Sequence, residues 1–395
     1  MMVYLNDCAI VCALGEDRAA VKRAMFAGAS GLAISEDCSP GRPLPLGRVG
    51  SPLPPADHLP LQHRSRNNRL ALAALAQIRP AVEAAIARYG AARVGVVIGT
   101  STSGVGETEA ALQVRHAKGQ LPGQFHYGQQ EMGSPAAMLA AELGVSGPAS
   151  VQSSACASGA KALASAARLI RMGLCDAVIA GGVDTLCAFT VAGFSALEAV
   201  SATPCNPLSV NRAGINLGEG AALFLMSAAP ASVALCGWGE SADGHHMSAP
   251  DPTGAGAQAA MAAALARGGI EAHQVDYINL HGTATAQNDA MEARAVAALF
   301  GGHAQLALSS TKPLTGHALG AAGAVEAALC WLAMQDDNPL GALPPQLWDG
   351  ALDPALPALN VAGPGAQLGR PLRYVLSNSF AFAGANATLL FGRMP

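Results

Sequence analysis

Cys156 is the residue of this sequence best suited to act as a nucleophile. It follows an extended run of Ser and Val residues and precedes an Ala/Leu-rich helical pattern that ends with Arg171 and Gly173. At such a strand-to-helix junction, free N–H groups and the helix dipole favour negative charge, so we expect a lowered pKa for the thiol. Its small neighbours leave room for a substrate carbonyl. The alternative is an inert cysteine buried in an apolar helix.

Two histidines in the second half of the chain occur in similar surroundings. His281 ends a buried strand in a Gly/Thr-rich segment, and His317 opens a helix. Lys312 lies five residues before His317, and Glu326 lies nine residues after it, about two and a half turns along that helix. A lone histidine at a strand end is usually structural. Two histidines at equivalent junctions favour a chemical role.

The elements that must position these residues occur twice. The strand "RVGVVIGTSTSG" of the first half parallels "QVDYINLHGTATAQND" of the second, and "DAVIAGGVDTL" parallels "RYVLSNSFAFAGAN". His317 then stands where the first half carries Cys156. Strands that alternate with helices in two similar halves predict an α/β fold in stacked layers. We place the boundary near Gly237–Ser248, which gives halves of residues 1–240 and 241–395.

Composition sets the broad class of the protein. The 395 residues are 51% hydrophobic and only 13% charged, with a net charge of −4. This balance indicates a large core and a sizeable subunit interface, and gives no global attraction to nucleic acid or an anionic membrane. Nine cysteines without CxxC spacing argue against a disulfide framework or a zinc site. We find no signal peptide or membrane-spanning run and expect a cytoplasmic protein.

Several longer motifs carry a resemblance to a known family. They are "SSACASGA" around Cys156, "HGTATAQND" with His281, "STKPLTGHALGAAGAVE" with His317, "NLGEGAA", and "SNSFAFAGANATLLF". The chain resembles the β-ketoacyl-acyl carrier protein synthases, the elongating branch of the thiolase superfamily, over essentially its whole length. Thiolases keep a second cysteine near the C-terminus, where this chain has "SNSFAFAGAN". The initiating synthases have asparagine where His317 stands.

This resemblance implies a thiolase-like fold and an acyltransferase. The expected reaction is the decarboxylative Claisen condensation of an acyl group on Cys156 with malonyl carrier protein, which makes a 3-oxoacyl thioester. His281 and His317 would stabilise the enolate formed by loss of CO2. The main-chain N–H groups of Cys156 and Phe382 would hold the acyl oxyanion. No cofactor or metal is implied, because the substrates are bound as thioesters to the phosphopantetheine of an acyl carrier protein.

Other residues receive roles from the same resemblance. Lys312 and Glu326 are similar to a charge pair that orients the histidines; the alternative is an ordinary buried ion pair. Thr283 and Thr285 match a hydrogen-bonding site for the phosphopantetheine arm. Phe380 belongs to the gate loop that contains the oxyanion residue. Three arginines match a face that docks acidic carrier protein, with a solvated helix end as the alternative: Arg64, Arg66 and Arg69.

The sequence departs from the family at two loops. In the gate loop, Ala381 and Ala383 replace glycines, so a positive φ becomes costly there. Ser209 and Ala213 stand where acidic residues are common. The sequence therefore leaves two alternatives for the pathway, which are fatty acid elongation and a dedicated type II polyketide or aryl-polyene assembly line. The subunit would form a homodimer, or a heterodimer with a chain-length factor that resembles a ketosynthase.

Two other classes of function are alternatives to a condensing acyltransferase. One is a non-catalytic chain-length-factor-like partner subunit, which the retained Cys156, His281 and His317 disfavour. The other is a hydrolase with a cysteine nucleophile, which would want a Cys-His pair oriented by a carboxylate. Acyl chain length and saturation depend on the shape of a tunnel that the sequence does not define.

Overall fold

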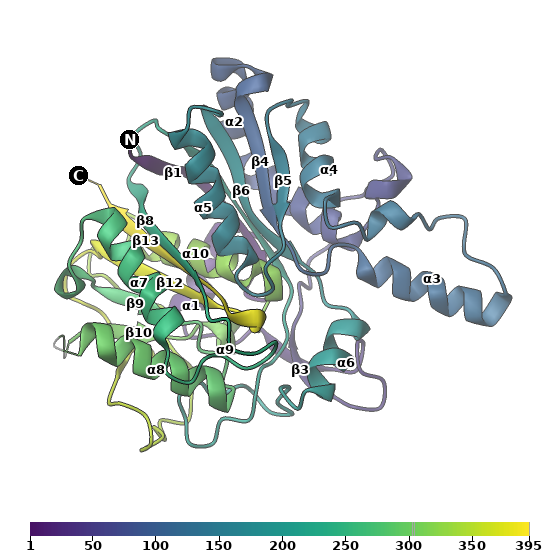
Figure 1. Ribbon diagram of the computed structural model, residues 1–395. Helices are drawn as coiled ribbons and strands as arrows, with labels where there is room; N and C mark the ends of the chain where they lie inside the picture. Colours follow the sequence, from purple (N-terminus) through teal and green to yellow (C-terminus); the bar gives the residue numbers. More distant parts are fainter. Residues whose placement is uncertain (302, 304, 395) are drawn as a thin grey trace.

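A computed structural model describes residues 1–301, 303 and 305–394 of the chain, and Figure 1 shows its arrangement. The strands are β1 (Val3–Cys12), β2 (Leu32–Ser35), β3 (Leu44–Gly47), β4 (Val94–Gly99), β5 (Ala149–Gln152), β6 (Ala177–Asp184), β7 (Gly220–Ser227), β8 (Val233–Ala242), β9 (Tyr277–Asn279), β10 (Ala307–Ser309), β11 (Asn360–Val361), β12 (Tyr374–Phe380) and β13 (Ala385–Arg393). The α-helices are α1 (Arg18–Phe26), α2 (Arg66–Tyr89), α3 (Val105–Lys118), α4 (Ser134–Leu143), α5 (Ser158–Arg171), α6 (Ala188–Ala196), α7 (Ala255–Gly268), α8 (Ala286–Phe300), α9 (Lys312–Thr315) and α10 (Ala322–Ala333).

The order of the strands is mirrored about the centre of the large sheet. The order is β11-β10-β9-β12-β13-β8-β1-β7-β6-β4-β5, and β2 and β3 form a separate hairpin. Outward from the central pair, β1-β7-β6-β4-β5 on one side matches β8-β13-β12-β9-β10 on the other, and both sets arise in the same chain order. The predicted α/β fold of two duplicated halves is therefore confirmed. The boundary at residues 240 and 241 stays a prediction; it falls within β8, which pairs with both β1 and β13.

Two small-residue helices fill the space between the halves. Helix α5 packs on β4 and β6, helix α10 packs on β7 and β12, and the two helices contact each other. Their glycines permit a close approach, since a Cβ added at Gly159 would lie 2.7 Å from the main-chain nitrogen of Ala324. The abundance of Ala and Gly in both sequences thus produces a tight central layer. Figure 1 labels α5 and α10 near the middle of the molecule.

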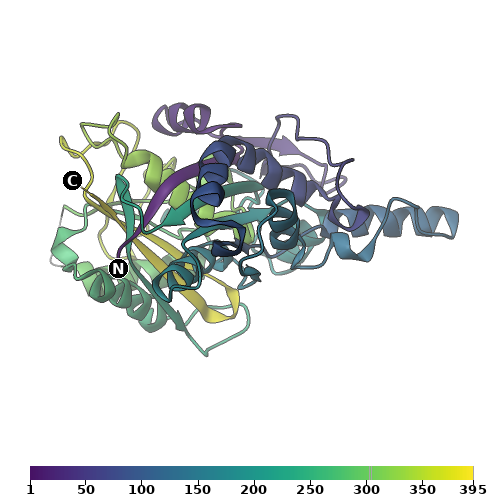
Figure 2. The same ribbon diagram turned by 90° about the horizontal axis from the view of Figure 1, so that it is seen from above.

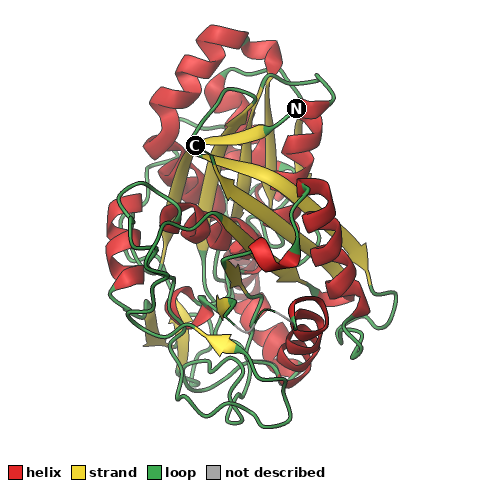
Figure 3. Cartoon of the chain, turned by 90° about the vertical axis from the view of Figure 1, so that its left-hand side faces the viewer, coloured by secondary structure: helices red, strands yellow, loops and turns green. Residues whose placement is uncertain are grey.

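The outer faces of the sheet are covered by separate helices, so the layers are stacked as predicted. Helices α2 and α4 cover the first half, and α7 with α8 covers the second. Figure 3 shows helices on both sides of the strands. Helix α2 is long and apolar enough to cross a membrane, but it packs against β1, β6 and β7 as a core helix. Helix α3 projects away from the body in Figures 1 and 2.

Candidate active site

Cys156 lies in the turn between β5 and the N-terminus of α5. The turn is fixed by Ser158, whose hydroxyl accepts a hydrogen bond from Ser154 N (2.8 Å) and donates one to Ala155 O (2.6 Å). Ala155 adopts a left-handed φ of 47°, a strained conformation for a residue with a Cβ. Strain of this kind persists where surrounding contacts over-determine the backbone, as they do around Cys156.

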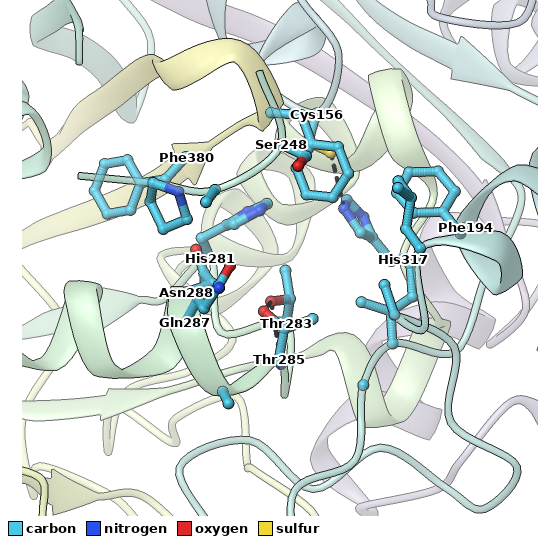
Figure 4. A pocket seen from close by; sticks show the side chains of 18 of the residues that line it. Cys156, Phe194, Ser248, His281, Thr283, Thr285, Gln287, Asn288, His317 and Phe380 are labelled. Atoms are coloured by element: carbon cyan, nitrogen blue, oxygen red, sulfur yellow. Dashed lines mark hydrogen bonds between the residues drawn. The ribbon is translucent and has the colours of Figure 1, made fainter. Parts of the chain in front are cut away.

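Two histidines from the second half meet Cys156 in one buried cluster. The Nε2 atom of His317 lies 3.0 Å from the Cys156 sulfur, and the rings of His281 and His317 meet edge to face with centroids 5.3 Å apart. Figure 4 shows all three side chains directed at the same space. The sulfur and one nitrogen of each ring lie within 4.8 Å of one another, a spacing that a metal ion could also use. A metal-free site stays a prediction.

The duplicated fold explains why these residues meet. Cys156 precedes α5 and His317 precedes α10, and these two helices pack side by side in the central layer. Equivalent positions of the two halves are thereby placed against each other. His281 follows β9, the equivalent of β4, and enters the cluster from the neighbouring strand end.

Lys312 and Glu326 form a buried ion pair beside His281. The Lys312 ammonium donates to a carboxylate oxygen of Glu326 and to the main-chain carbonyl of His281. It also lies 3.5 Å from His281 Nδ1. Since Lys312 has no acceptor lone pair, it can only donate, and this contact favours the tautomer in which Nε2 carries the proton.

The expected low pKa of the nucleophile is wrong for this structure. Burial raises the pKa of Cys156 to about 12, and the charge of Lys312 offsets this only in part. Helix α5 begins at Ser158, beyond the cysteine, and only 4% of Cys156 is exposed. Loss of hydration therefore outweighs the helix dipole. Burial, together with the charge of Lys312, lowers the pKa of His281 and His317 well below its usual range. The free site thus holds a neutral thiol beside two neutral imidazoles.

Three buried carboxylates hold the loops of the site, and sequence reasoning did not find Glu292 or Asp184. Glu292 accepts from the main-chain N–H groups of His281 (2.8 Å) and Gly282 (2.7 Å), and burial raises its pKa to about 7. Asp184 accepts from Gly320 N (2.6 Å), just after His317, and also from the loop after β4. In the sequence, Asp289 and Glu292 stand three residues apart, which places them on one face of α8, and this spacing was the signal that could have identified Glu292.

Asp289 holds the other side of the His281 loop. One carboxylate oxygen accepts from Ala284 N (3.1 Å) and the other from Leu208 N (2.8 Å). Ala284 has a left-handed φ of 63°. The loop that carries His281 is therefore clamped at both ends by acidic side chains of α8.

A cavity of about 550 Å³ opens onto the cluster. Its lining includes Cys156, Phe194, Arg212, His246, Ser248, His281, Thr283, Thr285, Asn288, His317, Phe380 and Phe382. The hydroxyls of the two threonines lie 3.0 Å apart. Thr283 and Thr285 are thus placed where a polar arm could pass on its way to the sulfur, a role that stays a prediction.

The gate loop follows β12 and contacts α6. The ring of Phe382 packs against Phe194 with centroids 5.5 Å apart. Ala383 adopts a left-handed φ of 63°, while Ala381 has an ordinary φ of −104°. Only one of the two alanines therefore carries the expected backbone cost. Ala383 N donates to Met247 O (2.8 Å), which ties the gate loop to the loop after β8.

The three arginines predicted to dock carrier protein do not line the cavity. Arg66 forms an ion pair with the buried carboxylate of Glu219 (2.5 Å). Arg64 donates to the carbonyls of Leu59 and Asp57, and Arg69 donates to those of Pro54 and Leu53. These contacts hold the segment before α2, and a docking role for the three stays a prediction.

Comparison with known families matches most of the chain. Residues 57–231 match the family described as beta-ketoacyl synthase, N-terminal domain, and residues 233–347 match beta-ketoacyl synthase, C-terminal domain.

Individual proteins are similar over most of their length. Nodulation protein E of Rhizobium sp. (strain N33) is 36% identical over 76% of this chain and 75% of its own. A 3-oxoacyl-[acyl-carrier-protein] synthase 2 of Staphylococcus aureus is 32% identical over 85% of this chain and 86% of its own. A solved ketosynthase (ApeO) from Xenorhabdus doucetiae, in complex with its chain length factor (ApeC), has 42% identity and a TM-score of 0.92, covering 100% of this chain and 98% of that one.

Proposed function

The chain belongs to the β-ketoacyl synthase family, and we propose that it condenses an acyl group on Cys156 with malonyl carrier protein. Membership makes it an acyltransferase of the condensing type with the thiolase fold. The observation that carries the residue-level proposal is the convergence of Cys156, His281 and His317 at the end of one cavity. No metal is needed for this chemistry.

In the first half-reaction, the Cys156 sulfur attacks the carbonyl carbon of an acyl thioester. The thiol proton passes toward His317 Nε2, 3.0 Å away, and finally to the carrier thiolate that leaves. Among the described residues, neither the Cys156 amide nor the Phe382 amide donates to another protein oxygen. Both are therefore free to hold the oxyanion that forms during the transfer.

In the second half-reaction, the malonyl thioester loses CO2 and its carbonyl becomes an enolate. Neutral imidazoles serve this step, since each can present an N–H to the developing negative charge. For His317 this requires the proton on Nε2, which is the opposite tautomer to the one that accepts the thiol proton in the first half-reaction. Lys312 supports this by holding Nδ1 of His281, which leaves the Nε2–H directed at the cavity. The enolate carbon then attacks the acyl-cysteine carbonyl, and the sulfur leaves to regenerate Cys156.

The partners follow from the same relatives. A neighbour with 42% identity is a ketosynthase in complex with a chain length factor, and we infer that this chain is a catalytic ketosynthase subunit, paired with such a factor or with a second copy. The retained Cys156 disfavours the non-catalytic alternative. Acyl carrier protein is the substrate-bearing partner. A cytoplasmic setting and the choice between fatty acid and polyketide or aryl-polyene elongation stay predictions.

Product analysis tests the proposal. The purified protein is mixed with acyl and malonyl carrier proteins, with and without a co-expressed chain-length-factor-like subunit, and the products are identified by mass spectrometry. We expect a 3-oxoacyl thioester. Release of free acid would indicate a hydrolase, and no product in either preparation would indicate a non-catalytic subunit.

A further inference from the structure

The mouth of the cavity has an exposed rim that is apolar and acidic. Leu197 and Glu198 line the cavity and face solvent, and Leu197 is 55% exposed. Met247 is 80% exposed and lies between two further lining residues, His246 and Ser248. We refer to Leu197, Glu198 and Met247 as the rim.

The charge of the rim is not compensated by the protein itself. Apart from histidines, the charged side chains that line the cavity are Glu198 and Arg212. The Arg212 guanidinium pairs with Asp353 at 2.6 Å and is 9% exposed, so its positive charge is neutralised. Glu198 forms no ion pair within the part of the chain that the structure describes. A partner that covers this mouth therefore meets a free carboxylate and two exposed apolar side chains.

This inference rests on the proposed function, in which acyl and malonyl groups reach Cys156 on the arm of a carrier protein. That protein must then sit on the rim. We propose that the rim docks an acyl carrier protein through an apolar surface that carries a basic side chain opposite Glu198, and that it disfavours a uniformly acidic one. Apolar contacts supply the affinity, and Glu198 selects the partner by repelling like charge.

Binding measurements test the proposal without relying on catalysis. A holo acyl carrier protein of fatty acid synthesis with an acidic recognition helix is labelled and titrated with the protein, and anisotropy gives the Kd. Between about 50 and about 300 mM salt, we expect the Kd to fall or stay constant, because salt screens the repulsion by Glu198. Glu198→Lys should tighten binding and make the Kd rise with salt, and replacing an acidic residue of the carrier helix by Lys should tighten binding to the unmodified protein.

A matched pair of variants tests the apolar part. Met247→Asp should weaken binding about tenfold, as expected for a charge placed in an apolar contact. Leu340→Asp, at a residue 55% exposed that does not line the cavity, should leave the Kd unchanged. Glu83→Lys, on the exposed face of α2, is the control for Glu198→Lys.

Two results would overturn the proposal. One is a Kd of the unmodified protein that rises steeply with salt and responds to Arg64→Glu but not to Glu198→Lys. The other is the same Kd for the Met247→Asp and Leu340→Asp variants. Absence of binding by every variant counts as this second result. Intact-mass detection of acyl-Cys156 after exposure to a small acyl thioester is read separately. Failure of acylation with normal docking would contradict the proposed function alone.

Discussion

The Cys156 sulfur and His317 Nε2 lie 3.0 Å apart, although 161 residues separate them in the chain. Each residue stands before one of the two central helices, so the contact joins the two halves of the duplicated fold. It also replaces the source of activation expected from the sequence. Because burial raises the pKa of the thiol, a neighbouring group must receive its proton, and His317 is the group within hydrogen-bond reach.

Cys156→Ala should abolish acyl-enzyme formation and condensation, since the other eight cysteines lie outside the cavity. Intact-mass spectrometry after an acyl thioester measures the first and product analysis the second. Cys38→Ala, at a half-buried cysteine away from the site, is the control and should remain acylated. Acylation of the Cys156 variant at another cysteine, with condensation retained, would refute the assignment.

The two histidines should differ in the first half-reaction and agree in the second. His281→Ala should still be acylated at Cys156, whereas His317→Ala should be acylated more slowly because the sulfur loses its imidazole partner. Both should release CO2 from malonyl carrier protein about 10²–10³-fold more slowly, the usual effect of losing an oxyanion donor. Time-resolved acylation and a separate decarboxylation assay measure these steps. Normal decarboxylation by either variant would show that its histidine does not hold the enolate.

Acid should destabilise the folded protein through its buried histidines. The folded state keeps His281 and His317 neutral, whereas in the unfolded chain they bind protons below about pH 6.5. The unfolded state then binds more protons, so the free energy of unfolding decreases as pH falls through that value, by up to about 1.4 kcal/mol per pH unit for each histidine. Thermal unfolding measured between pH 8 and pH 5 should show a melting temperature that decreases toward the lower pH. His281→Asn should flatten this decrease, and an unchanged pH slope would contradict the argument.

Replacing each of the two gate-loop alanines by glycine should change the free energy of unfolding in opposite directions. Ala383→Gly removes a left-handed φ strain of about 1–2 kcal/mol, partly offset by a more flexible unfolded chain, so we expect a net gain of about 0.5–1 kcal/mol. Ala381→Gly, at an ordinary φ, should lower the free energy of unfolding by about 0.5–1 kcal/mol. Denaturant unfolding measures both. If the two variants shift in the same direction, Ala383 is not strained.

Arg66→Glu should disturb folding more than docking. The new carboxylate would face Glu219, which is 1% exposed and would lose its cation, so we expect about 3 kcal/mol of destabilisation. Arg64→Glu, at an exposed side chain that contacts only carbonyls, should cost much less. Denaturant unfolding compares the two. Equal stability of both variants would show that the pair with Glu219 contributes little.

The sequence alone determined the layered α/β architecture and the residues that form the cluster. Alternation of apolar strands with helices is a local pattern, and so is the recurrence of that order in a second half, which predicted that His317 and Cys156 occupy equivalent positions. Motifs around Cys156, His281 and His317 are also local in the chain. Patterns of this kind can be recognised in the sequence without knowledge of what packs against them in the folded protein.

The protonation states, the ion pairs and the backbone strain were decided by the tertiary structure. The pKa of Cys156 depends on how completely the two halves exclude water from the sulfur, which no local pattern reports. Arg66 finds its carboxylate 153 residues away, so the residue that the sequence assigned to carrier-protein docking also forms an internal ion pair. Ala383 takes a left-handed φ while Ala381 does not, because φ there follows from how the gate loop is tied to its neighbours. Each of these properties is set by groups distant in sequence, whose proximity exists only once the chain has folded.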